Sequence, residues 1–293
     1  MRNNKALSLA LLAQVIWGLL PIYWKILDFL PPYQILAQRM VWSVVSLHIL
    51  LYFLKGPGYS KKLLVDKSHR RISFLGGIFV TANWFVYIWS VNSGHVLETS
   101  LGYYILPLLT GLFALFLGEK FNKNQWLAYG FAGVGVLISS FALGRFPWVA
   151  LFLASTFAIY TYFKKQSPLD AIDSLYTETI FVAPLALIYL IYAEVTGSGI
   201  SGNFPWTIWL LVSTTGVVTA LPLLLFGYGA RELPLNVVSF IQYMSPSFTF
   251  LLGIFVFKES FSVVRLLSFV FIWCGVAIFT LDQVKRRSKK SLT

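Results

Sequence analysis

The sequence repeats itself at a spacing of 139 to 140 residues. Under this shift Tyr104 falls on Tyr243 and Pro107 falls on Pro246. Each copy contains five apolar segments long enough to cross a bilayer. Because five is odd, the second copy is expected to enter the membrane from the opposite face. Inverted repeats of this kind are typical of secondary transporters, in which the substrate binds near the membrane midplane between the halves. The repeat therefore predicts a transport protein.

The composition places the chain in lipid. Of its 293 residues 57% are hydrophobic and only 12% are charged, and the mean hydropathy is +0.73. We expect an all-α, multi-pass membrane protein with ten transmembrane helices, each near the roughly 20 residues that span the hydrocarbon core. The apolar runs are 7–27, 33–54, 72–92, 97–118, 124–142, 147–163, 171–193, 205–229, 234–257 and 262–282.

The net charge of +12 is explained by topology. With the N-terminus inside, most of the 23 basic residues fall in loops on the cytoplasmic side. Only Arg145, Lys258 and Arg265 fall outside, while Lys25 and Arg39 lie in or near the membrane. This distribution follows the positive-inside rule and predicts that both termini are cytoplasmic. The basic residues do not form a surface that could bind nucleic acid, so no nucleic-acid partner is expected.

The two halves are predicted to be residues 1–143 and 144–284, followed by a basic cytoplasmic tail at 285–293. The chain has no Gly-x-x-x-x-Gly-Lys-[Ser/Thr] motif, so energy for uphill transport is expected from an ion or proton gradient or from a separate partner. It also has no Gly-x-Ser-x-Gly motif and no cluster of metal-ligand residues. We therefore expect no enzyme activity, no metal site and no cofactor.

Arg39 is the arginine that lies deepest in a predicted span. It comes about seven residues into the second apolar segment, roughly 10 Å along a helix axis. A charge at this depth costs about 2.5–3.5 kcal/mol, so it is a functional candidate by default. Its guanidinium is suited to hold a substrate carboxylate or phosphate, or to gate access. The alternative is that Arg39 snorkels toward the membrane surface or forms a structural ion pair with Asp28 or Glu98.

Two carboxylates are candidates for proton coupling. Glu178 lies in the seventh segment at the position related by the repeat to Gln38, where a buried carboxylate can take up and release a proton. The alternative is that Glu178 balances Lys164 or Lys165. Glu98 begins the fourth segment on the outer side, where it either takes part in the site or favours a helix N-terminus.

Pro107 and Pro246 occupy matching positions in the fourth and ninth segments. Proline removes a backbone hydrogen bond, and freed carbonyls at membrane depth are tolerated where they line a cavity. The pair therefore predicts two helix breaks beside a central cavity, although two merely curved helices are an alternative. The expected flanking residues are Tyr103, Tyr104, Gln242 and Tyr243.

Aromatic residues with polar edges gather inside the early segments. Trp17, Asn83, Trp84 and Tyr87 lie well within their spans and are suited to an aromatic or cationic organic guest. Packing against lipid is the competing interpretation. The fifth and tenth segments instead hold small residues, which indicates helix packing or a dimer contact. Both a monomer and a homodimer remain open.

Several short motifs together resemble one known family. They are IWG at 16–18, QRMVWS at 38–43, NW at 83–84, SVN at 90–92, ETSLGYY at 98–104 with Pro107, GE at 118–119, and FIQY at 240–243 with Pro246. In combination they resemble the RarD branch of the EamA-type drug/metabolite transporters, over about residues 6–282. The resemblance implies ten helices in two inverted halves, a bacterial inner-membrane location and export of small metabolites or drugs. It supplies neither a substrate nor a set of substrate contacts.

These observations predict a secondary transporter that moves a small organic metabolite or drug across the plasma membrane by alternating access. Efflux is favoured over import, with proton exchange as the candidate energy source. The expected partners are the solute and the lipid bilayer. A passive facilitator or channel is the alternative, although no ring of filter residues is visible.

Overall fold

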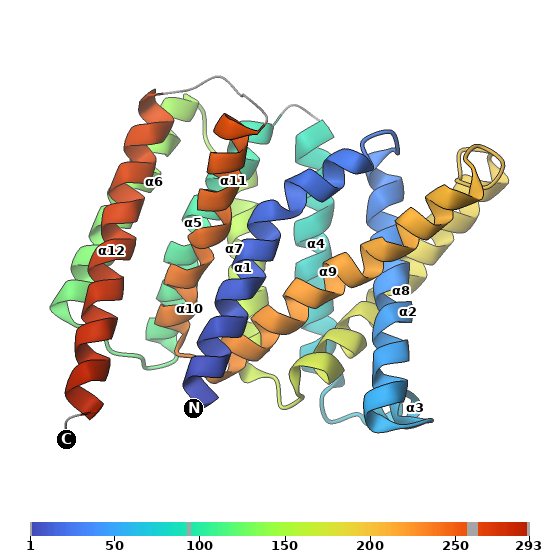
Figure 1. Cartoon of the computed structure of the whole chain (residues 1–293), viewed down its shortest axis with the longest axis horizontal. Coiled ribbons are helices and arrows are strands. Elements are labelled where there is room, and N and C mark those ends of the chain that lie inside the picture. The colour runs from blue at the N-terminus through green and yellow to red at the C-terminus, as the bar shows by residue number, and fades with distance from the viewer. Residues whose placement is uncertain (1, 93–94, 257–262, 292–293) are drawn as a thin grey trace.

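The computed structural model is a bundle of α-helices (Figure 1). It describes residues 2–92, 95–256 and 263–291, and this part of the chain contains no β-strand. Lys258, predicted to lie on the outer side, falls outside the described residues. The helices are α1 (Arg2–Ile26), α2 (Pro32–Lys55), α3 (Tyr59–Val65), α4 (Arg70–Asn92), α5 (Val96–Phe116), α6 (Lys123–Leu143), α7 (Trp148–Gln166), α8 (Ala171–Val195), α9 (Trp206–Glu232), α10 (Leu235–Gln242), α11 (Met244–Phe255) and α12 (Val263–Ser291).

The all-helical membrane class is confirmed. Within the described residues, 8 helical stretches are long and apolar enough to cross a membrane. They lie in α1, α2, α5, α6, α8, α9, α12 and the stretch that joins α10 to α11. The long helices α4 and α7 fall outside this set, so ten crossings remain a prediction.

Local signals in the sequence set the helix ends. Asn122 caps α6, since its side chain accepts a hydrogen bond from the Gln125 backbone at 2.9 Å while the Gln125 side chain accepts one from the Asn122 backbone at 3.0 Å. The same helix stops at Gly144, whose φ of 70° is left-handed and suits glycine. Between such ends the backbone groups bond within the helix, which is what a hydrocarbon environment demands.

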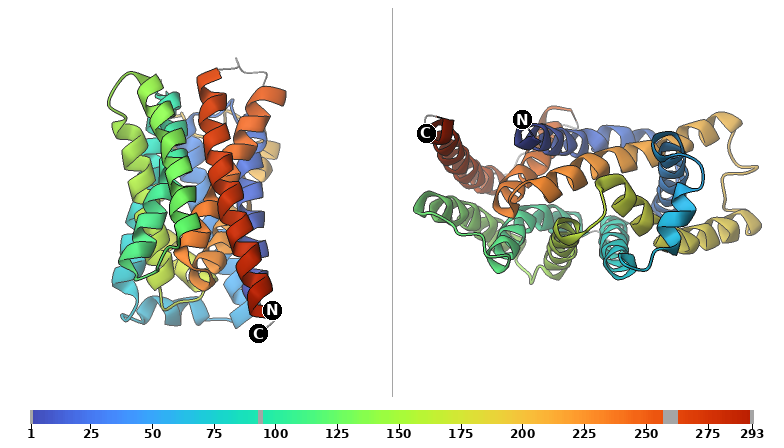
Figure 2. Two further views of the ribbon diagram at one scale, coloured as in Figure 1. Left: turned by 90° about the vertical axis from the view of Figure 1, so that its left-hand side faces the viewer. Right: turned by 90° about the horizontal axis from the view of Figure 1, so that it is seen from below.

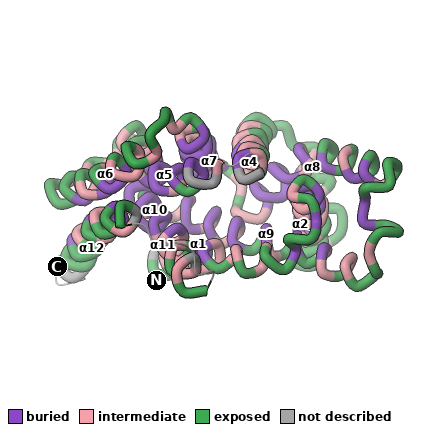
Figure 3. Tube along the Cα trace, turned by 90° about the horizontal axis from the view of Figure 1, so that it is seen from above, coloured by how far each residue is buried: buried purple, intermediate pink, exposed green. Residues whose placement is uncertain are grey.

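The helices form two layers, and each layer contains helices from both halves of the chain (Figure 3). One row holds α6, α5, α7, α4 and α8, and the other holds α12, α10 with α11, α1, α9 and α2. The start of α1 and the end of α12 lie at the same end of the bundle as α3 (Figures 1 and 2). α12 continues to Ser291, into the predicted tail.

Glycines bring α6 and α12 into backbone contact at one end of the layers. A Cβ at Gly135 would lie 2.6 Å from the carbonyl oxygen of Ser268, and a Cβ at Gly275 would lie 2.6 Å from that of Ala128. The two glycines are 140 residues apart in the sequence, so they match in the repeat. Small residues at these positions permit the close helix approach that stabilises membrane bundles.

A third glycine joins α2 to α9 beside the deepest arginine. A Cβ at Gly216 would overlap the backbone carbonyl of Trp42, so no side chain fits between the two helices. Thr219 lies one turn further along α9, and Arg39 lies one turn before Trp42 on α2. The contact therefore fixes the distance between Arg39 and Thr219.

Gly216→Ala is expected to destabilise the protein by about 1–3 kcal/mol, because the new methyl group meets rigid backbone and forces α2 and α9 apart. Gly130→Ala is the matched control, since a Cβ at Gly130 meets nothing within 4 Å. Thermal unfolding of the two variants in detergent checks the difference. Equal melting temperatures would show that the α2–α9 contact is looser than described.

Candidate functional site

Arg39 lies between two indole rings. Its Cζ is 4.9 Å from the ring centroid of Trp24 on α1 and 4.7 Å from that of Trp84 on α4. The guanidinium Nε donates a hydrogen bond to Thr219 Oγ1 on α9 at 3.2 Å. Cation–π contacts on both faces stabilise the charge without neutralising it.

No ion pair to Arg39 occurs among the side chains that the structure describes. Asp28 is bonded to Lys25 at 2.7 Å, and Glu98 is bonded to Arg145 at 2.8 Å. Both carboxylates considered as structural partners of Arg39 are thus engaged elsewhere. The positive charge of Arg39 therefore has no carboxylate to balance it within the described residues.

Two tyrosines complete the surroundings of the guanidinium. The phenol groups of Tyr87 on α4 and Tyr103 on α5 lie close enough to interact with it electrostatically. Their rings meet edge to face with centroids 6.1 Å apart. We call this group the Arg39 site: Trp24, Arg39, Trp84, Tyr87, Tyr103 and Thr219. It joins four helices of the first half to α9 of the second half, and it contains four of the residues singled out from the sequence.

Trp17 and Asn83 lie elsewhere. Trp17 packs against Phe157 and Phe226, with ring centroids 6.0 and 5.2 Å away. The buried Asn83 donates from Nδ2 to the carbonyl oxygen of Leu153 at 2.7 Å and to Thr156 Oγ1 at 3.0 Å. These contacts tie α4 to α7, so the amide donor of Asn83 already has partners.

Tyr104, Gln242 and Tyr243 are buried near α12 and α7. The ring of Tyr104 meets Phe269 edge to face at 5.0 Å. Gln242 Nε2 donates to Thr161 Oγ1 at 3.5 Å. Gln242 Oε1 and the Tyr243 hydroxyl are buried and have no hydrogen-bond partner in the described part of the chain. The structure gives no contact between these three residues and Arg39.

The two predicted proline breaks differ. α5 runs as one helix through Pro107. In the second half, α10 ends at Gln242 and α11 begins at Met244, so the chain changes helix at Tyr243, three residues before Pro246. A central cavity beside the two prolines stays a prediction.

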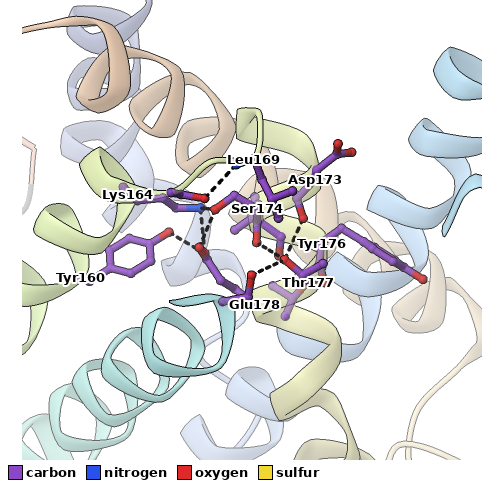
Figure 4. Close-up of polar contacts among 12 residues, drawn as sticks. Tyr160, Lys164, Leu169, Asp173, Ser174, Tyr176, Thr177 and Glu178 are labelled. Atoms are coloured by element: carbon purple, nitrogen blue, oxygen red, sulfur yellow. Dashed lines mark hydrogen bonds and ion pairs between the residues drawn. The ribbon is translucent and has the colours of Figure 1, made fainter. Parts of the chain in front are cut away.

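Glu178 is held in a buried cluster on α7 and α8 (Figure 4). Its Oε2 lies 2.7 Å from Lys164 Nζ, and the two side chains are 3% and 0% exposed. Ser174 donates to Glu178 Oε1 at 2.7 Å, and the Tyr160 hydroxyl donates to Oε2 at 3.3 Å. Lys164 also donates to Ser174 at 3.0 Å. This is the balancing arrangement that the sequence left as an alternative for Glu178.

The helix α4 closes over this cluster through glycines. A Cβ at Gly76 would lie 3.3 Å from Glu178 Oε1, and one at Gly77 would lie 2.7 Å from the Glu178 carbonyl oxygen. The ion pair is therefore covered by the first half of the chain. Proton transfer through Glu178 stays a prediction, and it requires that the contact with Lys164 open.

Glu98 caps a neighbouring helix. Its Oε2 accepts a hydrogen bond from the Val149 backbone at 3.2 Å, at the start of α7. Glu119 also caps a helix, a role that the sequence did not predict. Its carboxylate accepts hydrogen bonds from the backbones of Leu235 at 2.6 Å and Asn236 at 3.1 Å, at the start of α10. Both carboxylates lie where the helix dipole favours a negative charge.

A polar cluster that the sequence did not predict joins the two halves at the α3 end of the bundle. Lys55 Nζ lies 2.6 Å from Asp170 Oδ2 and 2.7 Å from Asp173 Oδ2. The Tyr59 hydroxyl donates to Asp173 Oδ2 at 2.8 Å. We call these four residues the Lys55 latch. Lys55 and Tyr59 lie more than 100 residues from Asp170 and Asp173 in the sequence, so only the folded chain reveals the latch.

The Lys55 latch is expected to weaken in acid. Burial alone would raise the pKa of Asp170, but the hydrogen bond from the Asp173 backbone and the contact with Lys55 hold that pKa below its ordinary value. A lowered pKa contributes stability above the ordinary value of about 4, and this contribution is lost as the pH falls through the lowered pKa.

Lys55→Met should therefore lower the melting temperature at pH 7, and its difference from the unaltered protein should shrink below about pH 4. Lys61→Met, at an exposed position of α3, is the control and should change little. A difference that stays constant with pH would contradict an ionic latch. Melting curves across the pH range supply the measurement.

Comparisons with known proteins identify the family and the fold of the chain. The EamA-like transporter family matches the chain twice, at residues 4–141 and 146–281. The uncharacterized transporter YojE of Bacillus subtilis is 44% identical over 285 residues, which cover 94% of each chain. Protein RarD of Escherichia coli is 34% identical and 99% of each chain is covered. A solved structure titled only "Crystal structure of protein" has a TM-score of 0.70 at 20% identity, covering 95% of this chain and 98% of its own, and shows the fold alone.

Membership of this family confirms the resemblance to RarD proteins and implies membrane transport of a small solute. The apolar helices and the relatives place the protein in the bacterial inner membrane as a multi-pass protein. The matching family is a family of transporters. The chain belongs to the EamA-like transporter family.

Proposed function

We propose that the protein is a secondary transporter that moves a small organic solute across the plasma membrane by alternating access. The observation that carries this proposal is the Arg39 site. A positive charge with no carboxylate partner among the described side chains lies where helices of both halves meet. Charges at membrane depth are costly and persist where they serve a pathway.

The two halves are proposed to be inverted repeats, residues 1–143 and 144–284. The family matches once within each of them. Equivalent helices face each other across the two layers, as α6 faces α12 (Figure 3). In Figure 1 α6 runs away from the α3 end while α12 runs toward it, as inversion requires. We propose ten crossings with both termini in the cytoplasm, which is supported by the position of the positively charged 55–71 segment at the same end as the termini.

The Lys55 latch is proposed to close the cytoplasmic entrance. It links α2 and α3 to the start of α8, so it must open when the halves rock apart at that end. Its contacts are partly exposed and ionic, which makes them reversible at modest cost. Export rather than import is the proposed direction, in line with the resemblance to drug/metabolite transporters.

Proton exchange is the proposed energy source. Glu178 is the candidate carrier, because opening of its ion pair with Lys164 would leave a buried carboxylate that favours a proton. Glu98 is the second candidate. No nucleotide-binding motif offers a different source within the chain.

Counterflow in proteoliposomes tests the transport proposal. Purified protein would be supplied with amino acids, vitamins and amphenicols, each with and without a proton gradient. We expect that one solute class on the far side accelerates entry of its labelled form, and that the gradient drives its accumulation. Downhill flux without acceleration by exchange would instead identify a passive facilitator. Flux of no solute class would contradict transport.

A further inference from the structure

The contacts of Arg39 limit the kind of solute that fits beside it. The guanidinium carbon lies over the ring of Trp24 at 4.9 Å and over the ring of Trp84 at 4.7 Å. The indole faces turned toward Arg39 are thus occupied by its own cation, and the fixed positive charge repels a cationic guest. The sequence had left both an anionic and a cationic guest open, and the geometry favours the anion.

The edge of the guanidinium is the part that remains for a ligand. Arg39 has five N–H donors, and the described contacts use one, from Nε to Thr219. Its two Nη groups have no hydrogen-bond partner among the described residues. A planar pair of N–H groups matches the two oxygens of a carboxylate, which makes a bidentate, charge-assisted contact.

The charges around the Arg39 site favour a ligand with a single negative charge. Lys164, a second buried cation in the described bundle, is already neutralised by Glu178. A dianion such as a phosphate monoester would therefore bring an excess negative charge into the bundle. An amino acid would bring an ammonium group, whereas Glu98 and Glu178 are already engaged.

The remaining surroundings are aromatic. The phenol groups of Tyr87 and Tyr103 lie within electrostatic range of the guanidinium, and their two rings meet edge to face. Aromatic side chains bury the apolar body of a guest and offer hydroxyl groups at their edges. A small hydrophilic anion would gain little from these walls.

We propose that the Arg39 site binds the carboxylate of a hydrophobic organic monoanion, with the body of the ligand against Tyr87 and Tyr103. This rests on the proposed transport function and names the class of its substrate. The guanidinium receives the carboxylate on its free edge while the two indoles keep its plane fixed. Thr219 on α9 links this recognition to the second half of the chain.

Ligands that share one ring and differ in the head group test the proposal. The full-length protein in detergent would be titrated with 3-phenylpropionate, 3-phenylpropionamide and 3-phenylpropylamine, and its melting temperature recorded. We expect the carboxylate to bind at least tenfold more tightly than the amide or the amine. Phenyl phosphate and phenylalanine should also bind more weakly than 3-phenylpropionate. Equal shifts for all head groups, a preference for the amine, or no shift with the carboxylate would overturn the proposal.

Two variants test whether the preference for a carboxylate depends on Arg39. Arg39→Gln should abolish the difference between carboxylate and amide, whereas Arg145→Gln should keep it because Arg145 pairs with Glu98 outside the Arg39 site. A carboxylate preference that survives in Arg39→Gln would also overturn the proposal. If Arg39→Gln does not fold, the proposal is tested by the order of affinities for the different head groups on the unaltered protein.

The same ligands separate this proposal from the transport function. If counterflow detects flux of a neutral or cationic solute while 3-phenylpropionate does not bind, the protein is a transporter and the monoanion proposal is wrong. If the carboxylate binds with the expected preference but neither 3-phenylpropionate nor any other solute class shows counterflow, the site stands and the transport function is wrong.

Discussion

Replacing Arg39 by lysine is expected to reduce transport about 10- to 100-fold while leaving the protein folded. Lysine keeps the charge but loses the planar group that stacks between Trp24 and Trp84 and bonds Thr219. Loss of one hydrogen bond to a charged group costs about 1.5–3 kcal/mol, which corresponds to that range. Initial counterflow rates in proteoliposomes with equal amounts of protein measure the effect.

Arg145→Lys is the matched control for this prediction. Arg145 is 53% exposed and pairs with Glu98 at the end of the bundle, so its replacement should leave the rate almost unchanged. Full transport by Arg39→Ala at normal protein levels would remove Arg39 from the site. Loss of folded protein in every Arg39 variant would instead assign it a structural role.

Breaking the buried ion pair is expected to have the largest effect on stability. Glu178→Gln leaves the charge of Lys164 buried without its partner, and such a change costs about 3–5 kcal/mol. The double variant Lys164→Met, Glu178→Leu removes both charges and should recover most of this loss. Lys25→Met at the exposed Lys25–Asp28 pair should change little. Unfolding in denaturant compares the variants.

The double variant also separates the role of Glu178 in folding stability from its proposed role in proton coupling. If Glu178 carries the proton, a folded double variant should still exchange labelled for unlabelled solute but should not accumulate it in a proton gradient. Full gradient-driven accumulation would exclude Glu178, and Glu98 would be the next carboxylate to replace. If neither changes the pH dependence, proton antiport is wrong.

The helical membrane class was predictable because apolarity is a local property of the chain. Every backbone group in hydrocarbon needs a partner, so a long apolar run has few structures open to it. The position of Arg39 within a long apolar helix was predictable for the same reason. Its contacts with Trp24 and Thr219 were not, because they depend on how α1 and α9 are rotated and on the close approach at Gly216.

Side-chain direction explains why other candidates lie apart from Arg39. Asn83 and Trp84 are neighbours in sequence, yet the amide faces α7 while the indole faces Arg39. Tyr103 and Tyr104 diverge in the same way, toward the Arg39 site and toward α12. Successive residues on a helix point in different directions, and no periodic signal in these spans reveals which one faces the interior.

Most of the other contacts that the sequence did not predict are polar contacts between segments far apart in the chain. Glu98 and Glu119 cap helices that begin many residues later, and the Lys55 latch joins α2 to α8. A sequence shows that such residues are charged, but not which helix end they reach.

Labelling of a single cysteine at Thr219 tests alternating access most directly. Cys274, the single cysteine of the chain, would first be replaced by alanine, and Thr219→Cys would then be introduced. Thr219 is 1% exposed in the structure, so its thiol can react only when the halves move. We predict that a membrane-impermeant maleimide labels it from each side of the vesicle without leaking through, while Ala158→Cys, at a buried position of α7, stays unlabelled from both sides. Labelling of Thr219→Cys from one side only, or from neither, would contradict a site that opens alternately to the two faces of the membrane.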